Sequence, residues 1–440
     1  MSRVPPESPS PEALPPLTLA SASPRRATLL AQLGRSFQVR PVDLDEIAHD
    51  GETPHDFVLR MAREKEQAGA HLVKSGFTLG GDTVIAHRGE ILGKPSSPSA
   101  AEETLGRLSG EAHQVLSGWA IADQSAQIIA SGVSEAQVRF HPLSPTQIQA
   151  YVESGEPLDK AGSYAIQGGG GRFVASLEGD FDGVVGMPTR AVAEALIQHA
   201  LLRPRDPALL RRLLQIRARL QRATIAGGRS VDQVKLIGVS KRQPVEALAA
   251  ACDHKLTRFG ENYIQELLEK GPTLEARLNQ EARAALEWHF IGQLQKRKTQ
   301  RLATSVDRVH SLWREKEARW LQEGAERAER TQPIPTLIQV NLSGEESKQG
   351  VTREALPALL DTLRAFPAVQ VCGLMTFPPY GEPESSRPWF KALRALRDEL
   401  KATHPQLTEL SMGVSHDFHV AAEEGATFVR VGSALFGPRG

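Results

Sequence analysis

The sequence predicts an α/β protein in two parts, a mixed α/β domain followed by a (β/α)8 barrel. Three observations support this prediction. The chain has 440 residues, enough for two or three domains of about 150 residues each. Short apolar strand patterns alternate with helical patterns through both halves. Residues 203–207, with two prolines and three charged side chains, interrupt the pattern and are interpreted as the linker.

The first half begins with residues 1–16, which contain six prolines and are interpreted as a disordered tail. Residues 17–202 form the predicted first domain. We expect strands at residues 17–20, 37–42, 79–86, 90–93 and 114–122, and helices at 27–33, 54–69, 144–154 and 191–202. Strands and helices do not alternate regularly here, so the pattern favours a mixed sheet. The four glycines at 168–171 lack the ending of a P-loop and are interpreted as a flexible loop near the substrate, with a hairpin turn as the alternative.

The second half, residues 208–440, has a regular rhythm. Eight strand patterns occur, at residues 235–240, 258–260, 288–292, 306–312, 335–342, 369–377, 407–412 and 428–432. Helical patterns lie between most of them, and this alternation over about 230 residues is typical of a (β/α)8 barrel. Residues 203–222 carry seven arginines and one acid. We interpret them as a solvated amphipathic helix, because no aromatic residues are interleaved as in a nucleic-acid surface.

Composition excludes several classes of protein. Lys plus Arg and Asp plus Glu number 52 each, which argues against a general binder of nucleic acid or of anionic membranes. The two cysteines are far apart and form neither a disulfide scaffold nor a cysteine zinc site. No apolar run approaches the roughly 18 to 20 residues of a membrane span, and the N-terminus shows no secretory signal. We therefore expect a cytoplasmic protein.

Polar and charged side chains occur where strands of the first domain end. Ser23 can cap a helix whose first turn holds Pro24, Arg25 and Arg26, an arrangement that can bind an anion. The same residues could simply start a helix.

Carboxylates and lysines accompany these arginines. Asp82 and Thr83 lie in an otherwise apolar strand, where an unpaired carboxylate is costly. Glu46 follows a predicted strand, Lys65 lies on a predicted helix, and Lys94 ends a strand. Taken singly, each could be a surface charge. Together they indicate a site for a triphosphate and a divalent cation.

Six segments of this half resemble the Maf family, over about residues 17–200. They are residues 19–26 (LASASPRR), 59–65 (LRMAREK), 81–83 (GDT), 91–95 (ILGKP), 108–110 (LSG) and 157–168 (PLDKAGSYAIQG). The resemblance implies an ITPase-like fold and a nucleoside triphosphate pyrophosphatase. Its last motif is similar to that of the subgroup that acts on dTTP and UTP.

The resemblance also implies roles for single residues. Asp82 would be the general base or metal ligand, with Glu46 as a second ligand of Mg2+ or Mn2+. Arginine and lysine side chains would bind the phosphates: Arg25, Arg26, Lys65 and Lys94. The residues that select the nucleotide base would be Arg25, Thr83 and Gln167. The family often has asparagine where Asp182 precedes Gly183 here. A non-hydrolytic regulator of septum formation is the alternative, and a homodimer is left open.

In the barrel half, Lys241 comes directly after a strand. Residues at the carboxyl ends of barrel strands face the active site, so this lysine is either a solvated charge or a Schiff-base lysine. Near the C-terminus, Arg430 lies inside a strand that runs into Gly432 and Ser433. Such a turn can bind phosphate through backbone N–H groups, and an arginine can face a pyridine nitrogen. His289, between Trp288 and Phe290, is interpreted as a packed strand histidine.

Seven segments of this half resemble the YggS/PROSC family, the pyridoxal phosphate (PLP) homeostasis proteins. They are residues 238–241 (GVSK), 259–266 (FGENYIQE), 288–295 (WHFIGQLQ), 339–343 (QVNLS), 348–350 (KQG), 373–375 (GLM) and 410–415 (LSMGVS). The resemblance implies that Lys241 holds PLP, that Arg430 faces its ring nitrogen, and that its phosphate binds Ser415, Gly432 and Ser433. Asn262, Met375 and Ser411 would line the cofactor. Arg297 replaces a usual asparagine.

The family resembles the barrel half of alanine racemase-type enzymes, whose β domain we do not expect here, since residue 440 follows shortly after the last strand. An arginine at the ring nitrogen also weakens the electron sink that carbanion chemistry needs. We therefore expect PLP binding without turnover, with an amino-acid racemase as the alternative. The expected ligands are dTTP, UTP and PLP, with neither nucleic acid nor membrane.

Overall fold

The computed structural model describes residues 14–345 and 348–438. Most of the predicted tail, residues 1–13, lies outside the described residues. The chain divides into two compact units. The first takes the described residues up to Ile91, with Val115–Glu135 and Asp182–Pro204; the second takes Leu92–Gln114, Ala136–Phe181 and the rest of the chain from Arg205.

The first half of the chain is built on a mixed sheet, as predicted. Its strand order is β2-β1-β3-β5-β6-β7, with β4 paired to β3. β1 is parallel to both β2 and β3, whereas β6 and β7 are antiparallel. The strands are β1 (Leu17–Leu19), β2 (Gln38–Val39), β3 (Phe77–His87), β4 (Glu90–Leu92), β5 (Ala112–Asp123), β6 (Ile128–Phe140) and β7 (Val174–Gly179).

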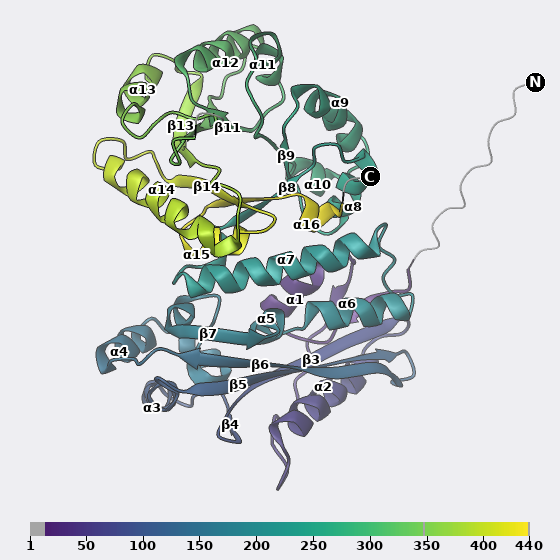
Figure 1. Ribbon diagram of the computed structural model, residues 1–440. Helices are drawn as coiled ribbons and strands as arrows, with labels where there is room; N and C mark the ends of the chain where they lie inside the picture. Colours follow the sequence, from purple (N-terminus) through teal and green to yellow (C-terminus); the bar gives the residue numbers. More distant parts are fainter. Residues whose placement is uncertain (1–13, 346–347, 439–440) are drawn as a thin grey trace, which may run out of the picture. The chain divides into compact units, whose positions relative to one another are not determined.

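Four helices of this half start in the same way. A Ser or Thr side chain accepts the backbone N–H three residues on, and proline occupies the first turn, where its missing N–H costs nothing. The caps are Ser23, Thr53, Ser97 and Ser144. The helices are α1 (Pro24–Ala31), α2 (Pro54–Ala70), α3 (Pro98–Leu108) and α4 (Pro145–Glu153), followed by α5 (Phe181–Val185) and α6 (Thr189–Gln198). In the first unit α2 covers one face of the sheet, and α1 and α6 lie on the other (Figure 1).

The four-glycine segment is neither a loop nor a hairpin, so that interpretation was wrong. It begins a 3-10 helix, η3 (Gly169–Phe173), in which Gly170 and Gly171 are buried. A Cβ on Gly168 would lie 1.5 Å from the Glu156 carboxylate, and one on Gly171 would lie 2.4 Å from the Ile166 carbonyl oxygen. Gly171 is therefore needed for close packing against the backbone, whereas the Glu156 side chain could move away from a side chain at position 168.

The second half forms the predicted barrel. Eight parallel strands close in the order β10-β11-β12-β13-β14-β15-β8-β9, which is the chain order taken round a ring (Figure 1). The strands are β8 (Lys235–Val239), β9 (Arg258–Glu261), β10 (Glu287–Phe290), β11 (Arg308–Leu312), β12 (Ile334–Gln339), β13 (Val369–Met375), β14 (Glu409–Val414) and β15 (Phe428–Val431). The mixed α/β half followed by a (β/α)8 barrel confirms the predicted fold class.

Helices surround the barrel and cover its apolar strands. They are α8 (Val245–Asp253), α9 (Ile264–Glu275), α10 (Gln280–Ala284), α11 (Lys296–Leu302), α12 (Glu315–Arg327), α13 (Leu356–Leu363), α14 (Arg387–Leu400), α15 (Phe418–Glu423) and α16 (Ser433–Phe436). Except for the short α10, which has no buried residue, their buried faces share one apolar core with the strands. Among the described residues, no helix is long and apolar enough to cross a membrane.

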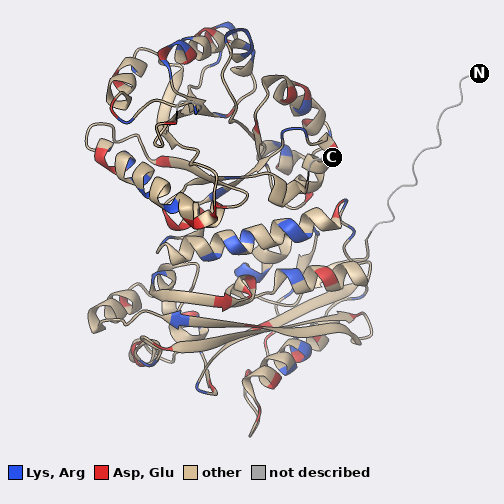
Figure 2. Ribbon diagram, in the orientation of Figure 1, with Lys and Arg blue, Asp and Glu red and all other residues tan. Residues whose placement is uncertain are grey.

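The arginine-rich segment is an amphipathic helix, α7 (Pro207–Ala226), with basic residues spaced along its ribbon (Figure 2). Its leucines and isoleucines are buried. The arginines are more than solvated charges: Arg212 donates to the Leu435 carbonyl at 2.6 Å, and Arg217 donates to the His254 carbonyl at 2.8 Å. These bonds join α7 to the loops and helices around the barrel.

Candidate functional sites

Asp82 lies on β3 and is 6% exposed. The buried carboxylate has a partner, because the Lys65 ammonium of α2 donates to Oδ1 at 2.9 Å. Lys65 is itself 7% exposed. A buried charge is tolerated when it is paired in this way, so the pair explains why both residues can lie inside the fold.

Glu46 joins the same group from the loop after β2. Its Oε1 accepts a hydrogen bond from Lys65 Nζ at 2.7 Å, so a single ammonium bridges Glu46 and Asp82. The Glu46 side chain is 41% exposed, which leaves the group accessible from solvent. The structure therefore brings together three of the predicted site residues.

Arg26 reaches this group from the first turn of α1. Its Nη2 lies 3.8 Å from Asp82 Oδ1 and donates to Thr83 Oγ1 at 3.3 Å. Burial lowers the pKa of Arg26, and the nearby carboxylates of Asp82 and Glu46 oppose that effect. Arg25, its neighbour in the first turn, is half-buried and lowers the pKa of Arg26 further. Cations and carboxylates thus alternate beside the middle of β3.

Sequence reasoning missed the residues that hold Arg26 and Thr83 in place. Arg26 Nε donates to the Gly186 carbonyl at 2.9 Å. Thr83 Oγ1 lies 2.7 Å from Ser117 Oγ, which donates to the Gly183 carbonyl at 2.6 Å. Nothing in the sequence marks Ser117, because it lies on β5, far from the motifs. Gly186, in contrast, belongs to the loop that had been noted for its departure from the family pattern.

That departure, Asp182, has a structural role. It is 4% exposed and accepts a hydrogen bond from the Thr189 hydroxyl at the start of α6. Its backbone carbonyl accepts the N–H groups of Gly186 and Met187, each at 3.0 Å. Asp182 therefore shapes the turn that presents the Gly186 carbonyl to Arg26.

Lys94 and Gln167 belong to the second unit, unlike the residues above. Lys94 is exposed and follows β4, and Gln167 is half-buried just before η3. Their part in phosphate binding and in base choice stays a prediction.

The residues of this site fit a divalent cation that is shared with phosphate. Two carboxylates converge on one point, the Lys65 ammonium, and carboxylate oxygens are the ligands that Mg2+ prefers. Among the described residues no group of three or more His, Cys, Asp or Glu side chains could hold a metal ion. Such a cation would therefore take the rest of its shell from phosphate and water.

The second candidate site lies at the carboxyl ends of the barrel strands. Ser415, after β14, accepts the backbone N–H groups of Gly432 and Ala434 at 3.0 and 3.4 Å. A Cβ on Gly432 would lie 3.3 Å from that of Val239, at the end of β8. The predicted phosphate-binding turn, with exposed Ser433, therefore packs against the strand that leads to Lys241.

Lys241 is half-buried, two residues beyond β8. Its strand end is fixed by a charged cluster: Lys270 of α9 donates to the Ser240 carbonyl at 2.8 Å, to Glu261 at 2.8 Å and to Glu266 at 2.6 Å. Ser240 also donates to Glu261 at 2.8 Å. Ser240, Glu261 and Glu266 lie in the quoted motifs, but the sequence gave no signal that Lys270 of α9 joins them.

Arg430 lies on β15 and is 1% exposed. Its Nη1 donates to Ser411 at 2.5 Å, its Nη2 donates to the Thr376 carbonyl at 3.0 Å, and its guanidinium lies 4.4 Å from the Phe377 ring centroid. Burial lowers its pKa to about 10, so it stays a cation at neutral pH.

Polar atoms at this end of the barrel are buried without a hydrogen-bond partner among residues 14–345 and 348–438, and two of them belong to predicted site residues. They are Arg430 Nε and Asn262 Oδ1, and Glu261 Oε2 and His416 Nε2 bring the number at this end to four. Met375 is fully buried and pairs in register with Ser411 on the neighbouring strand. A planar ligand with an acceptor atom in its ring and a phosphate group would fit these residues. Arg430 Nε offers the N–H donor, Asn262 an amide, and the turn at Gly432 backbone N–H groups.

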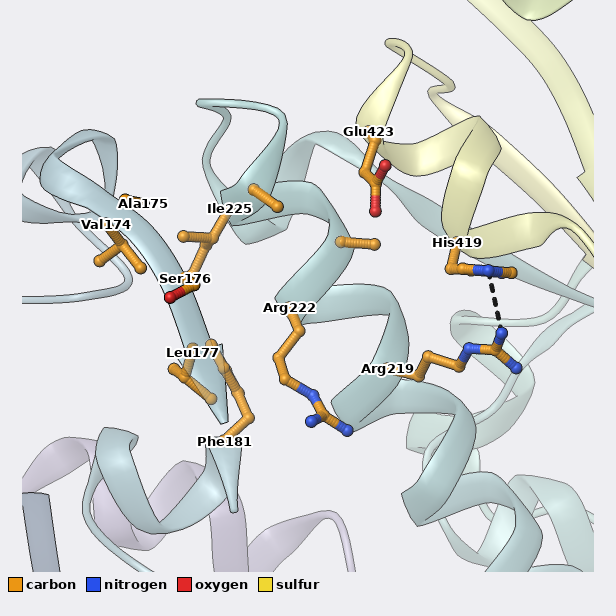
Figure 3. A pocket seen from close by; sticks show the side chains of 12 residues that line it. Val174, Ala175, Ser176, Leu177, Phe181, Arg219, Arg222, Ile225, His419 and Glu423 are labelled. Atoms are coloured by element: carbon orange, nitrogen blue, oxygen red, sulfur yellow. Dashed lines mark hydrogen bonds between the residues drawn. The ribbon is translucent and has the colours of Figure 1, made fainter. Parts of the chain in front are cut away.

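The second unit also contains a cavity of about 320 Å3 between β7, α7 and α15, which holds none of the predicted site residues. Figure 3 shows Arg219 and Arg222 of α7 beside it, with Arg219 hydrogen-bonded to His419 at 2.9 Å. Burial and Arg219 lower the pKa of His419 to about 4, so this imidazole is neutral.

Comparison with known proteins separates the two halves. Residues 16–199 match the family of Maf-like proteins, and residues 214–440 match the alanine racemase N-terminal domain. The pyridoxal phosphate homeostasis protein of Aquifex aeolicus is 44% identical over 230 residues, which are 52% of this chain and 97% of that protein. The dTTP/UTP pyrophosphatase of Anaeromyxobacter sp. is 47% identical over 183 residues, 41% of this chain and 87% of that protein. That of Symbiobacterium thermophilum is 45% identical over 182 residues, 41% of this chain and 93% of that protein. The chain therefore belongs to the Maf-like protein family through its first half and to the alanine racemase N-terminal domain family through its second.

Proposed function

We propose that residues 17–202 hydrolyse nucleoside triphosphates, dTTP and UTP among them, to the monophosphate and pyrophosphate. Residues 208–440 bind and supply PLP without turning over a substrate of their own, and residues 203–207 link the two. The observation that carries the first activity is the convergence of Asp82, Glu46, Lys65 and Arg26 within one unit. The identities to dTTP/UTP pyrophosphatases support it.

The hydrolysis is an in-line attack of water on the α-phosphorus. We assign the proton-accepting role to Asp82 Oδ2, because Oδ1 accepts the Lys65 hydrogen bond. Lys65 and Arg26, with Arg25 and Lys94, neutralise charge on the phosphates and on the leaving pyrophosphate. Glu46 and Asp82 would hold Mg2+ or Mn2+, which supplies further charge neutralisation when bound. Gln167 can read a pyrimidine edge, since its amide both donates and accepts.

The barrel binds PLP through residues from both ends of its chain. Lys241 would hold the aldehyde end, and the turn of Ser415, Gly432 and Ser433 would bind the phosphate. Arg430 Nε, the unpaired buried donor, would face the ring nitrogen. Bound PLP can withdraw electrons from an amino acid, but an arginine beside an unprotonated ring nitrogen weakens this withdrawal and favours a carrier. A cytoplasmic location stays a prediction, and the free cysteines Cys252 and Cys372 are consistent with it.

One experiment tests both halves. The full-length protein is incubated with a panel of nucleoside triphosphates and Mg2+ or Mn2+, the products are identified, and the visible absorption is recorded after PLP is added. We expect monophosphate and pyrophosphate from dTTP and UTP, and an absorption band of protein-bound PLP. Inertness toward every triphosphate with both metals would overturn the first half of the proposal, and the absence of PLP binding would overturn the second.

A further inference from the structure

The interior of the barrel contains a line of polar side chains where branched apolar residues usually pack. His289 on β10, His310 on β11 and Ser411 on β14 are 0% exposed. Burying an imidazole ring costs free energy unless its nitrogens are hydrogen-bonded. Two buried imidazoles in a barrel core therefore indicate a role beyond packing.

Four hydrogen bonds connect five side chains through the barrel. Arg430 Nη1 donates to Ser411 Oγ at 2.5 Å, and Ser411 Oγ lies 2.8 Å from His310 Nδ1. His310 Nε2 lies 2.8 Å from His289 Nδ1, and His289 Nε2 lies 3.3 Å from Glu287 Oε2. The line runs from the first residue of β10 to the guanidinium beside the proposed PLP ring.

The protons of this line can be assigned from its Glu287 end. Burial favours the neutral form of Glu287, but hydrogen bonds from His289 and Arg258 lower its pKa to about 2, so it can only accept. Burial lowers the pKa of His289 and lowers that of His310 strongly, so both rings are neutral.

A neutral imidazole has one N–H donor and one acceptor nitrogen. His289 must therefore carry its proton on Nε2 toward Glu287 and accept at Nδ1. His310 then donates a hydrogen bond from Nε2. Its Nδ1 accepts a hydrogen bond from the hydroxyl of Ser411. Ser411 in turn accepts from Arg430. All four donors point the same way, from Arg430 to Glu287.

We propose that Glu287, His289, His310 and Ser411 are positioning residues that hold the Arg430 guanidinium with its Nε–H aimed at the ring nitrogen of the bound cofactor. This inference rests on the proposed PLP binding. The line of hydrogen bonds fixes Nη1, the Thr376 carbonyl fixes Nη2, and Phe377 fixes the plane of the group. Nε is the one guanidinium nitrogen without a partner among the described residues, so it is the donor left for a ligand.

The first test needs no cofactor. Nitrogen chemical shifts of the imidazoles are measured in full-length, histidine-labelled protein without PLP, and His289→Gln and His310→Gln variants assign the signals. We expect both rings to be neutral with the proton on Nε2. A proton on Nδ1 of either ring, or an imidazolium, would overturn the assigned direction and with it the proposal.

The second test measures recognition of the ring nitrogen. Affinities of the full-length protein are compared for PLP and for an analogue in which the ring nitrogen is replaced by C–H. We expect the wild type to prefer PLP and His310→Phe to lose about ten-fold of that preference, the effect of one hydrogen bond to a charged group. His310→Gln, which can both donate and accept, should restore most of it.

His404→Phe is the matched control. His404 is also buried in this half of the chain, but its hydrogen bonds go to Thr403 and Arg364. We expect it to lower stability without changing the preference for PLP. If His310→Phe does not fold, Ser411→Ala breaks the line with a smaller change. If His310→Phe or Ser411→Ala binds PLP with an unchanged preference over the analogue, the inference is overturned. If the wild type does not bind PLP, the proposed function is overturned instead. The chemical shifts would then still decide the direction of the hydrogen bonds.

Discussion

We propose that Lys65 has two tasks in the first site. It neutralises two carboxylates in the folded chain, and it is also placed to neutralise a phosphate. A triphosphate that enters with a divalent cation brings charge of both signs to the same position. The ammonium can then pass from carboxylate to phosphate without leaving either charge buried alone.

We predict that Lys65→Met lowers triphosphate hydrolysis by about 100-fold, since a preorganised cation next to developing charge contributes on this order. Steady-state kinetics on dTTP, with pyrophosphate detection, measure the change. Lys74→Met, which removes an exposed lysine just beyond α2, serves as the control and should act like the wild type. Activity of Lys65→Met within about threefold of the wild type would contradict this role.

Glu66, next to Lys65 on α2, is buried against β3, where a Cβ on Gly80 would lie 2.7 Å from its carboxylate. It is 0% exposed, and it accepts the Ala122 N–H at 3.3 Å. Burial raises the pKa of Glu66 to about 8, and the nearby Thr78 hydroxyl and the Ala122 N–H oppose the rise. The carboxyl is therefore protonated in the folded protein at neutral pH. When it ionises, the folded protein loses stability.

The sign of the pH dependence follows from this. The pKa of Glu66 is higher in the folded protein than in the unfolded chain. Its contribution to the free energy of unfolding is therefore complete below the unfolded pKa near 4.5. It is lost as the pH rises toward 8, at about 1.4 kcal/mol for each pKa unit. We predict that Glu66→Gln removes this loss and makes the protein more stable than the wild type at pH 8 and above. Denaturant unfolding of the two proteins across pH measures the difference, with Glu64→Gln, which changes a half-buried acid paired with Arg60 on the same helix, as the control. Parallel curves would contradict the prediction.

At the scale of elements, α9 and β9 fix the end of β8. Lys270 joins the buried Glu261, the half-buried Glu266 and the Ser240 carbonyl, one residue before Lys241. Burial raises the pKa of Glu261, and Lys270 opposes that rise. Without the lysine, Glu261 would be a buried carboxylate with no counter-ion.

We predict that Lys270→Met lowers the free energy of unfolding by about 3–5 kcal/mol, the usual effect of removing one partner of a buried pair. PLP should also dissociate faster, because the Ser240–Lys241 backbone loses a hydrogen bond. Adding Glu261→Gln should recover part of the stability. Lys255→Met, which breaks the exposed pair with Glu281, should cost less than about 1 kcal/mol. Equal losses in the two lysine variants would argue against a buried cluster.

Some helices and strands are easier to predict from the sequence than others. All eight barrel strands were predicted, because a strand buried on both faces contains a continuous run of apolar residues, such as residues 236–239. α3, β6 and β7 were not. β6 is half-exposed over much of its length, so its alternation of polar and apolar residues is weak, and Gly132 within it packs against the Trp119 ring instead of adding a side chain.

At the scale of the whole molecule, the two proposed activities share no residue. We predict that Asp82→Asn abolishes triphosphate hydrolysis and leaves PLP absorption unchanged, while Lys241→Ala does the reverse. Pyrophosphate release and the visible spectrum, recorded on the same samples, give both readouts.

Two variants control this experiment. Asp45→Asn changes an exposed acid beside Glu46, and Lys235→Ala changes an exposed lysine at the opposite end of β8 from Lys241. Both should keep both activities. Loss of PLP binding in Asp82→Asn, or of hydrolysis in Lys241→Ala, would show instead that the two halves depend on each other.

By itself the sequence determined the fold class, the division into two halves and the residues that carry charge at strand ends, because periodicity and local motifs are properties of neighbouring residues. It identified Asp82, Glu46, Lys65 and Arg26 one by one, and only the tertiary structure showed that Lys65 bridges the two carboxylates. The sequence did not indicate a role for Ser117 or Lys270, nor the hydrogen bonds that connect Glu287 with Arg430. Their roles come from contacts between residues that are far apart along the chain, and such contacts exist only once strands of different motifs lie next to each other in a sheet or barrel.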